Sequence, residues 1–359
     1  MNASKTLRKA LAAALAFSLA APVAGAGFVD VLDTPAQMSP LAAKSLLQGV
    51  ARAGNRLVAV GQRGHVVVSD DNGATWKQSS VPVSSDLTAV FFVDDKQGWA
   101  VGHDGVILHS SDGGDTWQLQ LDGRKANDLL VAAMERAVAA EPSSAAAKAL
   151  LTEAQRYKEQ GADKPFLDVW FSDAKNGYVV GAYNLIFHTE DGGATWESLF
   201  DRTDNPKFFN LYAIRPVAGE LYIAGESGLA MKLDPATKRF VALGVPYNGS
   251  FFGVAGAGSS VLVFGLRGNV YRSDDAGKTW AKTDAGLPAA IVGAAPADGG
   301  AILLADGGGR IAASVDGGRT FAKVALKNPV PLTGFATIGS DRFVLVGPRG
   351  ATVTEIAAR

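Results

Sequence analysis

The stretch "SSDGGDTW" at residues 110–117 decides the fold, because its pattern returns along most of the chain. It places an acid, glycines, a threonine and an aromatic residue at fixed offsets. The other copies are "SDDNGATW" (69–76), "TEDGGATW" (189–196), "SDDAGKTW" (273–280) and "SVDGGRTF" (314–321). Self-similarity at a fixed period is typical of repeat architectures. The sequence therefore predicts a fold assembled from equivalent units.

Each copy has an upstream half that predicts three strands before the polar turn. Residues 86–110, "DLTAVFFVDDKQGWAVGHDGVILHS", align with 165–189 and with 250–273. A worn copy at 210–240 and an incomplete one at 332–356 bring the number of units to seven. Seven four-stranded units of about 40 residues predict an all-β, seven-bladed β-propeller over residues 27–359. We expect "GFVDVLD" (27–33) to supply the missing fourth strand of the last blade and so close the ring.

Residues 121–164 interrupt the repeat after the second blade. Leu130, Met134, Ala137 and Val138 recur at helical spacing, and a second helical stretch runs from Pro142 to Gly161. The sequence thus predicts an inserted helical hairpin, on the side of the ring that carries the turns between second and third strands. Two interpretations stay open for it, a lid packed on its own blade and an arm that binds a partner.

Composition agrees with an exported β-protein. The 359 residues include 42 Gly and no Cys, so the fold needs many tight turns and no disulfides. The formal net charge of −1 gives no reason to expect a nucleic-acid partner. Residues 1–26 read as a signal peptide, with basic residues, a short apolar run and a small-residue cleavage site. We expect a periplasmic, monomeric protein without membrane insertion after cleavage; the alternative is an uncleaved anchor.

The repeated motif resembles the Asp-box, or BNR repeat, of propeller proteins. Its acid is expected to bind the backbone of its own turn, and its aromatic residue to turn inward between blades. The residues assigned this structural role are Asp71, Trp76, Asp112, Trp117, Asp191, Trp196, Asp275, Trp280, Asp316 and Phe321. The alternative is a set of catalytic or calcium-binding carboxylates. Five equivalent loops without the ligand spacing of an EF-hand disfavour it, so we expect no metal and no cofactor.

The turn between second and third strands carries the candidate binding residues. "GQRG" (61–64), "GLRG" (265–268) and "GPRG" (347–350) put Arg63, Arg267 and Arg349 in one slot of blades one, five and seven. Such turns ring the central opening on one face, where the three arginines form a positive patch with His103, Tyr183 and Glu226 as neighbours. The patch either contacts an anionic or polar partner, or each arginine pairs with an acid on the next blade.

Many Asp-box proteins are sialidases or other glycosidases, so an enzyme is the alternative function. A sialidase needs three arginines, a tyrosine nucleophile with a glutamate, and an acid in an axial pocket. Its early aromatic-Arg-Ile-Pro segment is absent; the nearest string, "AIRP" (213–216), lies mid-chain and is expected to end an inner strand. His109 and His188 take equivalent places in adjacent blades, where a packing or surface role is favoured over a metal pair. No catalytic residue is assigned.

The whole pattern resembles BNR propellers of the photosystem II stability/assembly factor type. The resemblance is carried by "GWAVGHDGVILHSSDGGDTW" (98–117), "GYVVGAYNLIFHTEDGGATW" (177–196) and "GLRG" (265–268). It implies an exported, non-enzymatic propeller that binds assembly intermediates of a membrane protein complex through an arginine patch on one face. The helical hairpin at 121–164 is not part of the family's basic blade.

Overall fold

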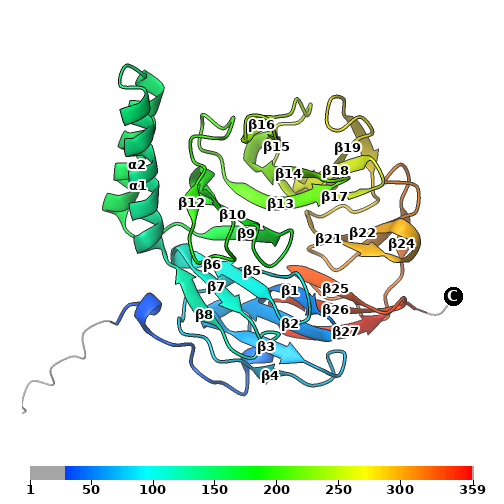
Figure 1. Ribbon diagram of the computed structural model, residues 1–359. Helices are drawn as coiled ribbons and strands as arrows, with labels where there is room; N and C mark the ends of the chain where they lie inside the picture. Colours follow the sequence, from blue (N-terminus) through cyan, green and yellow to red (C-terminus); the bar gives the residue numbers. More distant parts are fainter. Residues whose placement is uncertain (1–28, 358–359) are drawn as a thin grey trace, which may run out of the picture.

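Seven antiparallel sheets form a closed ring in the computed structural model, which describes residues 29–357 (Figure 1). Blades one to six have four strands each and blade seven has three. Neighbouring strands in each blade follow one another in the chain, as the repeat predicts. The predicted seven-bladed propeller is therefore confirmed.

The first four blades contain strands β1 to β16. Their bounds are β1 Leu47–Ala53, β2 Arg56–Gly61, β3 Val66–Ser69, β4 Lys77–Gln78, β5 Leu87–Phe92, β6 Gly98–Gly102, β7 Ile107–Ser110, β8 Gln118–Leu121, β9 Phe166–Phe171, β10 Gly177–Gly181, β11 Ile186–Thr189, β12 Glu197–Ser198, β13 Leu211–Val217, β14 Glu220–Gly225, β15 Ala230–Asp234 and β16 Arg239–Ala242.

The last three blades contain strands β17 to β27. Their bounds are β17 Phe251–Ala257, β18 Ser260–Gly265, β19 Asn269–Ser273, β20 Ala281–Asp284, β21 Ile291–Ala297, β22 Ala301–Asp306, β23 Ile311–Ser314, β24 Ala322–Val324, β25 Gly334–Ile338, β26 Arg342–Gly347 and β27 Gly350–Glu355.

The core lies between blades rather than at the centre of the ring. Second strands such as β2 and β18 read as nearly continuous apolar runs and are buried on both faces by the adjoining blades. Between blades one and two, Val58 and Val60 pack with Val90 and with Trp117, the aromatic residue of the second Asp-box. The same wedge-shaped packing recurs around the ring, so each blade depends on its neighbours for burial.

The N-terminal segment does not close the ring as a strand, and that prediction is wrong for the described part, residues 29–33. Val31–Asp33 forms a 3-10 helix instead, with Asp30 accepting a hydrogen bond from the N–H of Leu32 (3.0 Å). Leu32 is buried against blades one and two, and the carbonyl of Val31 accepts from Ser84 (2.9 Å). The local cap and this apolar anchor therefore hold the segment beside blade one. Residues 27 and 28 lie outside the described part.

Direct packing of blade seven on blade one closes the ring. The Thr333 hydroxyl donates to the carbonyl of Leu47 (2.7 Å), and Arg52 donates to the carbonyl of Thr337 (3.1 Å). Leu57 of blade one also packs with Ile338 and Val344 of blade seven. Side-chain burial and these bonds take the place of a fourth strand from the N-terminus.

The predicted insertion is confirmed as two helices, α1 (Gly123–Ala140) and α2 (Ala145–Gln160), which stand out from the ring (Figure 1). Asp122 caps α1 by accepting from the N–H of Lys125 (3.0 Å), and Ser144 caps α2. Gly161 ends α2 with φ of 86°, a conformation that favours glycine. Leu130 and Met134 are buried, as the helical stripe indicates.

The predicted signal peptide lies outside the described residues. Within residues 29–357, neither helix combines the length and the apolar character needed to cross a bilayer.

Candidate partner-binding face

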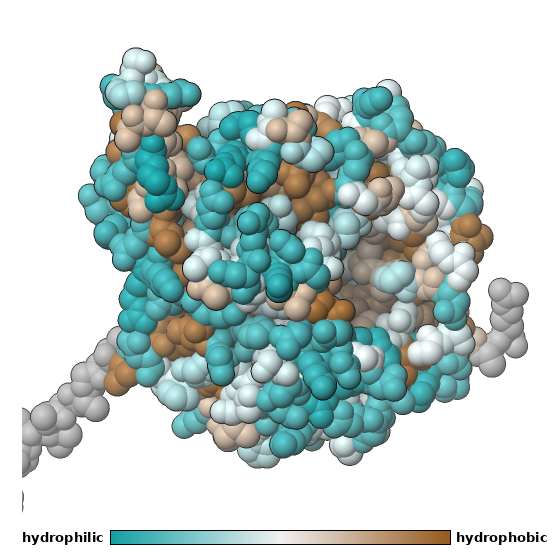
Figure 2. All heavy atoms as spheres, viewed as in Figure 1, coloured by the Kyte–Doolittle hydropathy of each residue, from teal (hydrophilic) through white to brown (hydrophobic). Residues whose placement is uncertain are grey.

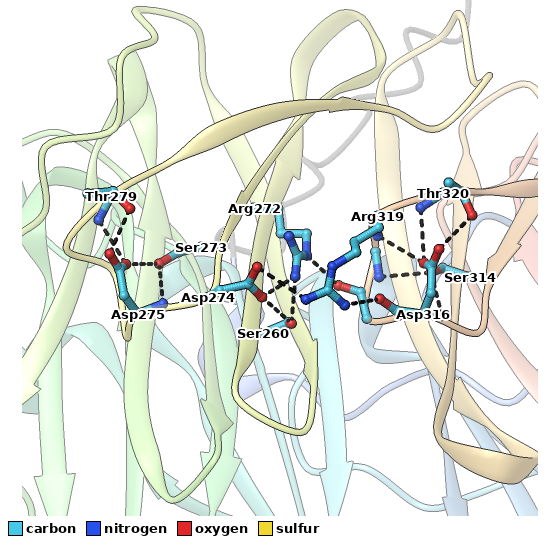
Figure 3. Close-up of polar contacts among 12 residues, drawn as sticks. Ser260, Arg272, Ser273, Asp274, Asp275, Thr279, Ser314, Asp316, Arg319 and Thr320 are labelled. Carbon is cyan, nitrogen blue, oxygen red and sulfur yellow. Dashed lines mark hydrogen bonds and ion pairs between the residues drawn. The ribbon is translucent and has the colours of Figure 1, made fainter.

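The Asp-boxes lie on one side of the ring and are occupied by their own hydrogen bonds. Asp275 accepts from the N–H and the hydroxyl of Thr279 (2.8 and 2.6 Å) and from the hydroxyl of Ser273 (2.8 Å), as Figure 3 shows. Asp316 makes the same bonds with Thr320 and Ser314 in the next blade. The equivalent bonds recur at Asp71, Asp112 and Asp191.

Asp-boxes also tie neighbouring blades together through one backbone carbonyl. The carbonyl of Gly113 accepts from Arg56 of the preceding blade (3.3 Å), and that of Gly317 accepts from Arg272 (2.8 Å). In blade three the carbonyl of Gly192 accepts from Trp99 and Gln120 of blade two (3.3 and 2.8 Å). The box is thus a wedge that enters the gap beside the previous blade.

The turns between second and third strands lie on the opposite side of the ring. Most of these turns have the same backbone conformation. The second residue of the turn donates its N–H to the carbonyl of the residue just before the blade's first strand, as His103 does to Asp86 (2.8 Å). The third residue has a left-handed conformation, with φ of 55° at Arg63, 57° at Arg267 and 53° at Tyr183. The turns of blades one to five also contact the inner strand of the next blade. Backbone contacts therefore fix the turn and leave its side chain free.

Arg63, Arg267 and Arg349 are all exposed. Within residues 29–357 their guanidinium groups form no ion pair and no hydrogen bond with another residue, although fifteen ion pairs are present elsewhere in that range. In the described chain no acid of the next blade pairs with these guanidinium groups, although the carboxylate of Asp86 in blade two accepts from the backbone N–H of Arg63 (2.7 Å). Three cations on one side of a nearly neutral protein are available to an external anion.

The seventh turn differs from the other two arginine turns. Val346 pairs with Ala351, whereas Val60 pairs with Val66, so this turn is one residue shorter. Pro348 accounts for the difference, because its fixed φ favours the second position of a tight β-turn. Arg349 is consequently not in the left-handed slot of Arg63 and Arg267, although it lies on the same side of the ring.

The other predicted neighbours occupy two kinds of position. Tyr183 takes the left-handed slot of the arginines and is 51% exposed. Its N–H donates to the side chain of Asn210 in blade four (2.9 Å), and the backbone of Asn210 donates to Glu226 (3.2 Å). His103 and Glu226 stand one residue earlier in their turns; His103 is exposed and Glu226 half-buried.

The hairpin is anchored beside these turns by residues that sequence patterns did not single out. Tyr157 of α2 is fully buried, and its hydroxyl donates to the carbonyl of Tyr183 (3.1 Å). The ammonium group of Lys164 lies 4.5 Å from the centre of the Tyr157 ring and 6.0 Å from that of Tyr183. Burial raises the pKa of Tyr157, which keeps its hydroxyl a donor.

A groove of about 900 Å³ lies between the outer part of the hairpin and blades three and four. Ala140, Ala147 and Leu150 line the helical side, and Phe200 and Phe208 line the other. The two phenylalanine rings stack with centroids 5.3 Å apart, although Phe208 has φ of 53°. Figure 2 shows the hairpin standing out from the ring with hydrophobic residues near its base. The groove therefore adds apolar surface on the side of the arginine turns.

The string "AIRP" lies within β13, the inner strand of blade four, and its arginine forms an ion pair. Arg215 binds both oxygens of Asp168 (2.6 and 2.9 Å), and the backbone of Ile214 donates to the same carboxylate (2.8 Å). Burial raises the pKa of Asp168, and the adjacent guanidinium charge opposes that shift. A substrate carboxylate would have to compete with this pair, which disfavours a sialidase role for Arg215.

Comparison with known proteins places the chain in a family. The family described as "Photosynthesis system II assembly factor YCF48" matches residues 36–110, 53–142 and 148–295. These matches span more than half of the sequence, so the chain belongs to this family of BNR propellers. A curated relative, "Photosystem II assembly lipoprotein Ycf48" from Synechococcus sp. (strain CC9902), is 31% identical over 118 residues. That alignment covers 32% of this chain and 35% of the relative, about a third of each.

Solved structures agree on the fold. The structure titled "YCF48 bound to D1 peptide" has a TM-score of 0.61 at 15% identity and covers 88% of this chain and 95% of its own. "YCF48 from Cyanidioschyzon merolae" has a TM-score of 0.60 at 19% identity, covering 90% and 98%. The WD40 propeller domain of Doa1 reaches 0.59 at 8% identity, covering 91% and 96%. At these identities the likeness shows the propeller fold alone.

Proposed function

We propose that this protein is an exported, non-enzymatic binding module that helps to assemble or stabilise a membrane or envelope protein complex. Its partner docks on the side of the ring that carries Arg63, Arg267 and Arg349, beside the helical hairpin. The proposed location is the periplasm, after removal of residues 1–26.

The unpaired state of the three arginines is the observation that carries the proposal. An exposed guanidinium that no residue of the described chain neutralises offers a planar donor set for a carboxylate or another anionic group. The groove under the hairpin supplies apolar surface on the same side of the ring, where Glu141, Asp201 and Asp204 also line it. The best fit is a segment whose anionic part meets the arginines and whose apolar part enters the groove. Membership of the family and the D1 peptide bound to one YCF48 support a polypeptide partner.

Crosslinking and affinity capture from intact cells tests the arginines. The test variant combines Arg63→Asn, Arg267→Asn and Arg349→Asn, since Asn tolerates the left-handed conformation of Arg63 and Arg267. The control combines Lys96→Ala, Lys175→Ala and Lys278→Ala, which removes the same charge from exposed positions on the Asp-box side. We expect the arginine variant to lose partners that the control retains. Equal recovery by both variants would refute the assignment of this face.

Removing the hairpin tests its share of the surface. The two ends of the insertion touch, because Gly123 lies against Ala162, so deletion of residues 124–161 leaves a short connection. We expect fewer or weaker captured partners while the ring stays folded, as judged by circular dichroism. An unchanged set of partners would assign the hairpin to packing alone.

A further inference from the structure

The gap between blades three and four differs from its neighbours because blade four lacks an Asp-box. Residues 233–240, "LDPATKRF", stand where blade five has "SDDAGKTW", so Pro235 replaces the box acid and Thr237 replaces Gly277. The segment forms another turn, in which Asp234 accepts from Ala236 (3.0 Å) and Thr237 (2.7 Å). Blade four therefore has no Asp-box carbonyl to enter the gap beside blade three, whereas the Gly192 carbonyl of blade three enters the gap beside blade two.

The gap between blades two and three serves as a matched reference. There Trp99 donates to the carbonyl of Gly192 (3.3 Å), and a ring nitrogen of His109 bonds with Gln97 (2.9 Å). The equivalents in blade three are Tyr178, His188 and Asn176. Asn176 is one methylene shorter than Gln97, and its amide is bonded to Asp173 (2.9 and 3.1 Å).

In the gap between blades three and four, some polar ring atoms consequently have no hydrogen-bond partner in the described chain. Within residues 29–357, the Tyr178 hydroxyl, the ring nitrogens of His188 and the indole N–H of Trp170 make no hydrogen bond, and none of them is sealed from solvent. Burial lowers the pKa of His188, so the neutral ring offers one donor and one acceptor at neutral pH. Tyr178 and His188 therefore lack the protein partners that Trp99 and His109 have, and the Trp170 indole adds a further free donor, so the three groups point to an external partner.

These rings line a cleft of about 480 Å³. Trp170, Tyr178 and His188 stack on one another in a row across β9, β10 and β11, with centroids 6.4 and 4.3 Å apart and planes within 26°, so neighbouring ring faces cover each other. Leu221 and Leu233 of blade four form the facing wall. The volume and the mixture of aromatic and polar groups match small-molecule sites. The cleft opens on the Asp-box side, away from the arginine turns, because turns between first and second strands line it.

The charges around the cleft are balanced. Glu197 pairs with Arg202 (2.8 Å) and Glu220 pairs with Lys232 (3.0 Å). In the described chain Glu190 and Lys238 form no ion pair, and their charges have opposite signs. Three acids and two bases line the cleft, and Lys232 behind the lining brings the sum to zero. A ligand with net charge would therefore meet no excess of the opposite sign, whereas hydroxyl groups can pair with both donors and acceptors.

We propose that the cleft between blades three and four binds a neutral mono- or disaccharide. Tyr178, His188, Trp170 and Glu190 exchange hydrogen bonds with the hydroxyls of the sugar, and Leu221 and Leu233 pack on its C–H groups. This site goes beyond the proposed function and lies on the other side of the ring. Saccharide binding and partner capture therefore succeed or fail independently.

Titration calorimetry of the full chain tests the proposal, with maltose, cellobiose and N,N′-diacetylchitobiose as probes and glycylglycine as a zwitterionic comparison. We expect saturable binding of at least one disaccharide. His188→Ala and Tyr178→Phe should each weaken it about tenfold, the effect of one lost hydrogen bond. His109→Ala, the matched change in the filled gap, should leave the affinity unchanged.

Asn176→Gln sharpens the test, because it rebuilds in blade three the partner that Gln97 gives to His109. It should weaken saccharide binding without lowering the unfolding temperature. Absence of binding by all three disaccharides at millimolar concentration would overturn the proposal. Binding of glycylglycine alone, or equal losses in His188→Ala and His109→Ala, would overturn it as well.

Discussion

The two sides of the ring use the repeat in opposite ways. On the Asp-box side five blades repeat the same side chains, and Asp112 makes the bonds that Asp275 makes. On the other side the backbone of the turn repeats while its third residue changes, from Arg63 to Tyr183 to Ser227. The difference follows from what holds each turn in place.

The identity of a residue is constrained where its side chain makes the contact that holds the turn, and it can vary where the backbone makes that contact. The box turn needs an acid to satisfy its own N–H groups and an aromatic residue to fill the gap between blades. The other turn is held by N–H groups that donate to the chain before each first strand, so its side chain contributes little to folding. Binding residues are therefore expected on the side that carries the turns between second and third strands. Mutations on that side should affect binding, and mutations on the Asp-box side should affect stability.

The largest effect is expected for Trp117→Ala on the box side. Trp117 is 4% exposed, meets the edge of Phe92 and donates to the carbonyl of Gly114 (3.1 Å). Loss of a buried aromatic side chain should lower the free energy of unfolding by about 3–5 kcal/mol, measured by urea denaturation. Trp117→Phe, which keeps an aromatic ring, should cost less. A loss within about 0.5 kcal/mol for Trp117→Ala would contradict a wedge role for the box.

A smaller loss is expected for Asp112→Ala. Asp112 accepts from the N–H of Thr116 (3.0 Å) and from the hydroxyls of Thr116 (2.6 Å) and Ser110 (2.8 Å). Its removal should cost about 1–2 kcal/mol in the same experiment. Asp112→Asn retains one acceptor oxygen and should fall between the wild type and Asp112→Ala. Equal stability of all three proteins would show that the box acid is dispensable.

Stability should also fall in acid through the box carboxylates. Hydrogen bonds from the Thr279 hydroxyl and N–H lower the pKa of Asp275 from 3.8 to about 2, and Thr75 lowers that of Asp71 to about 2. A group whose pKa is lower in the folded state stabilises the protein above its unfolded pKa and loses that effect as pH falls towards 2. The urea midpoint should therefore drop between about pH 4 and pH 2. Asp275→Asn should flatten this drop; an unchanged slope would contradict the assignment.

Sequence periodicity predicted the blade count from the repeated Asp-box unit, and it predicted the hairpin from the helical spacing of apolar residues where that repeat is interrupted. The same argument missed the ring closure, since a capped 3-10 turn and the burial of Leu32 outweighed strand pairing for residues 29–33. It also placed Arg349 in the slot of Arg63, although Pro348 shortens that turn. Local backbone preferences decided both cases.

The anchors of the candidate face were less accessible from sequence. The helical stripe indicated Leu130 and Met134, but the contact of Tyr157 with the Tyr183 turn depends on how α2 lies across blade three. The cleft beside blade four did leave a signal, since Pro235 stands where the other boxes have Asp. The missing Asp-box alone does not predict a cleft, because the cleft also depends on how the neighbouring blades pack around that position.

The smallest effect on stability is expected in the arginine turns. Arg267 forms no ion pair or hydrogen bond through its guanidinium in the described chain, so Arg267→Asn should change the free energy of unfolding by less than about 0.5 kcal/mol. The next residue gives the contrast. Gly268 has φ of 72°, and a Cβ there would collide with the carbonyl of Leu287, so Gly268→Ala should destabilise the protein clearly. Equal losses at the two positions, measured by urea denaturation, would mean that the arginine side chain helps to build the turn and is not free for a partner.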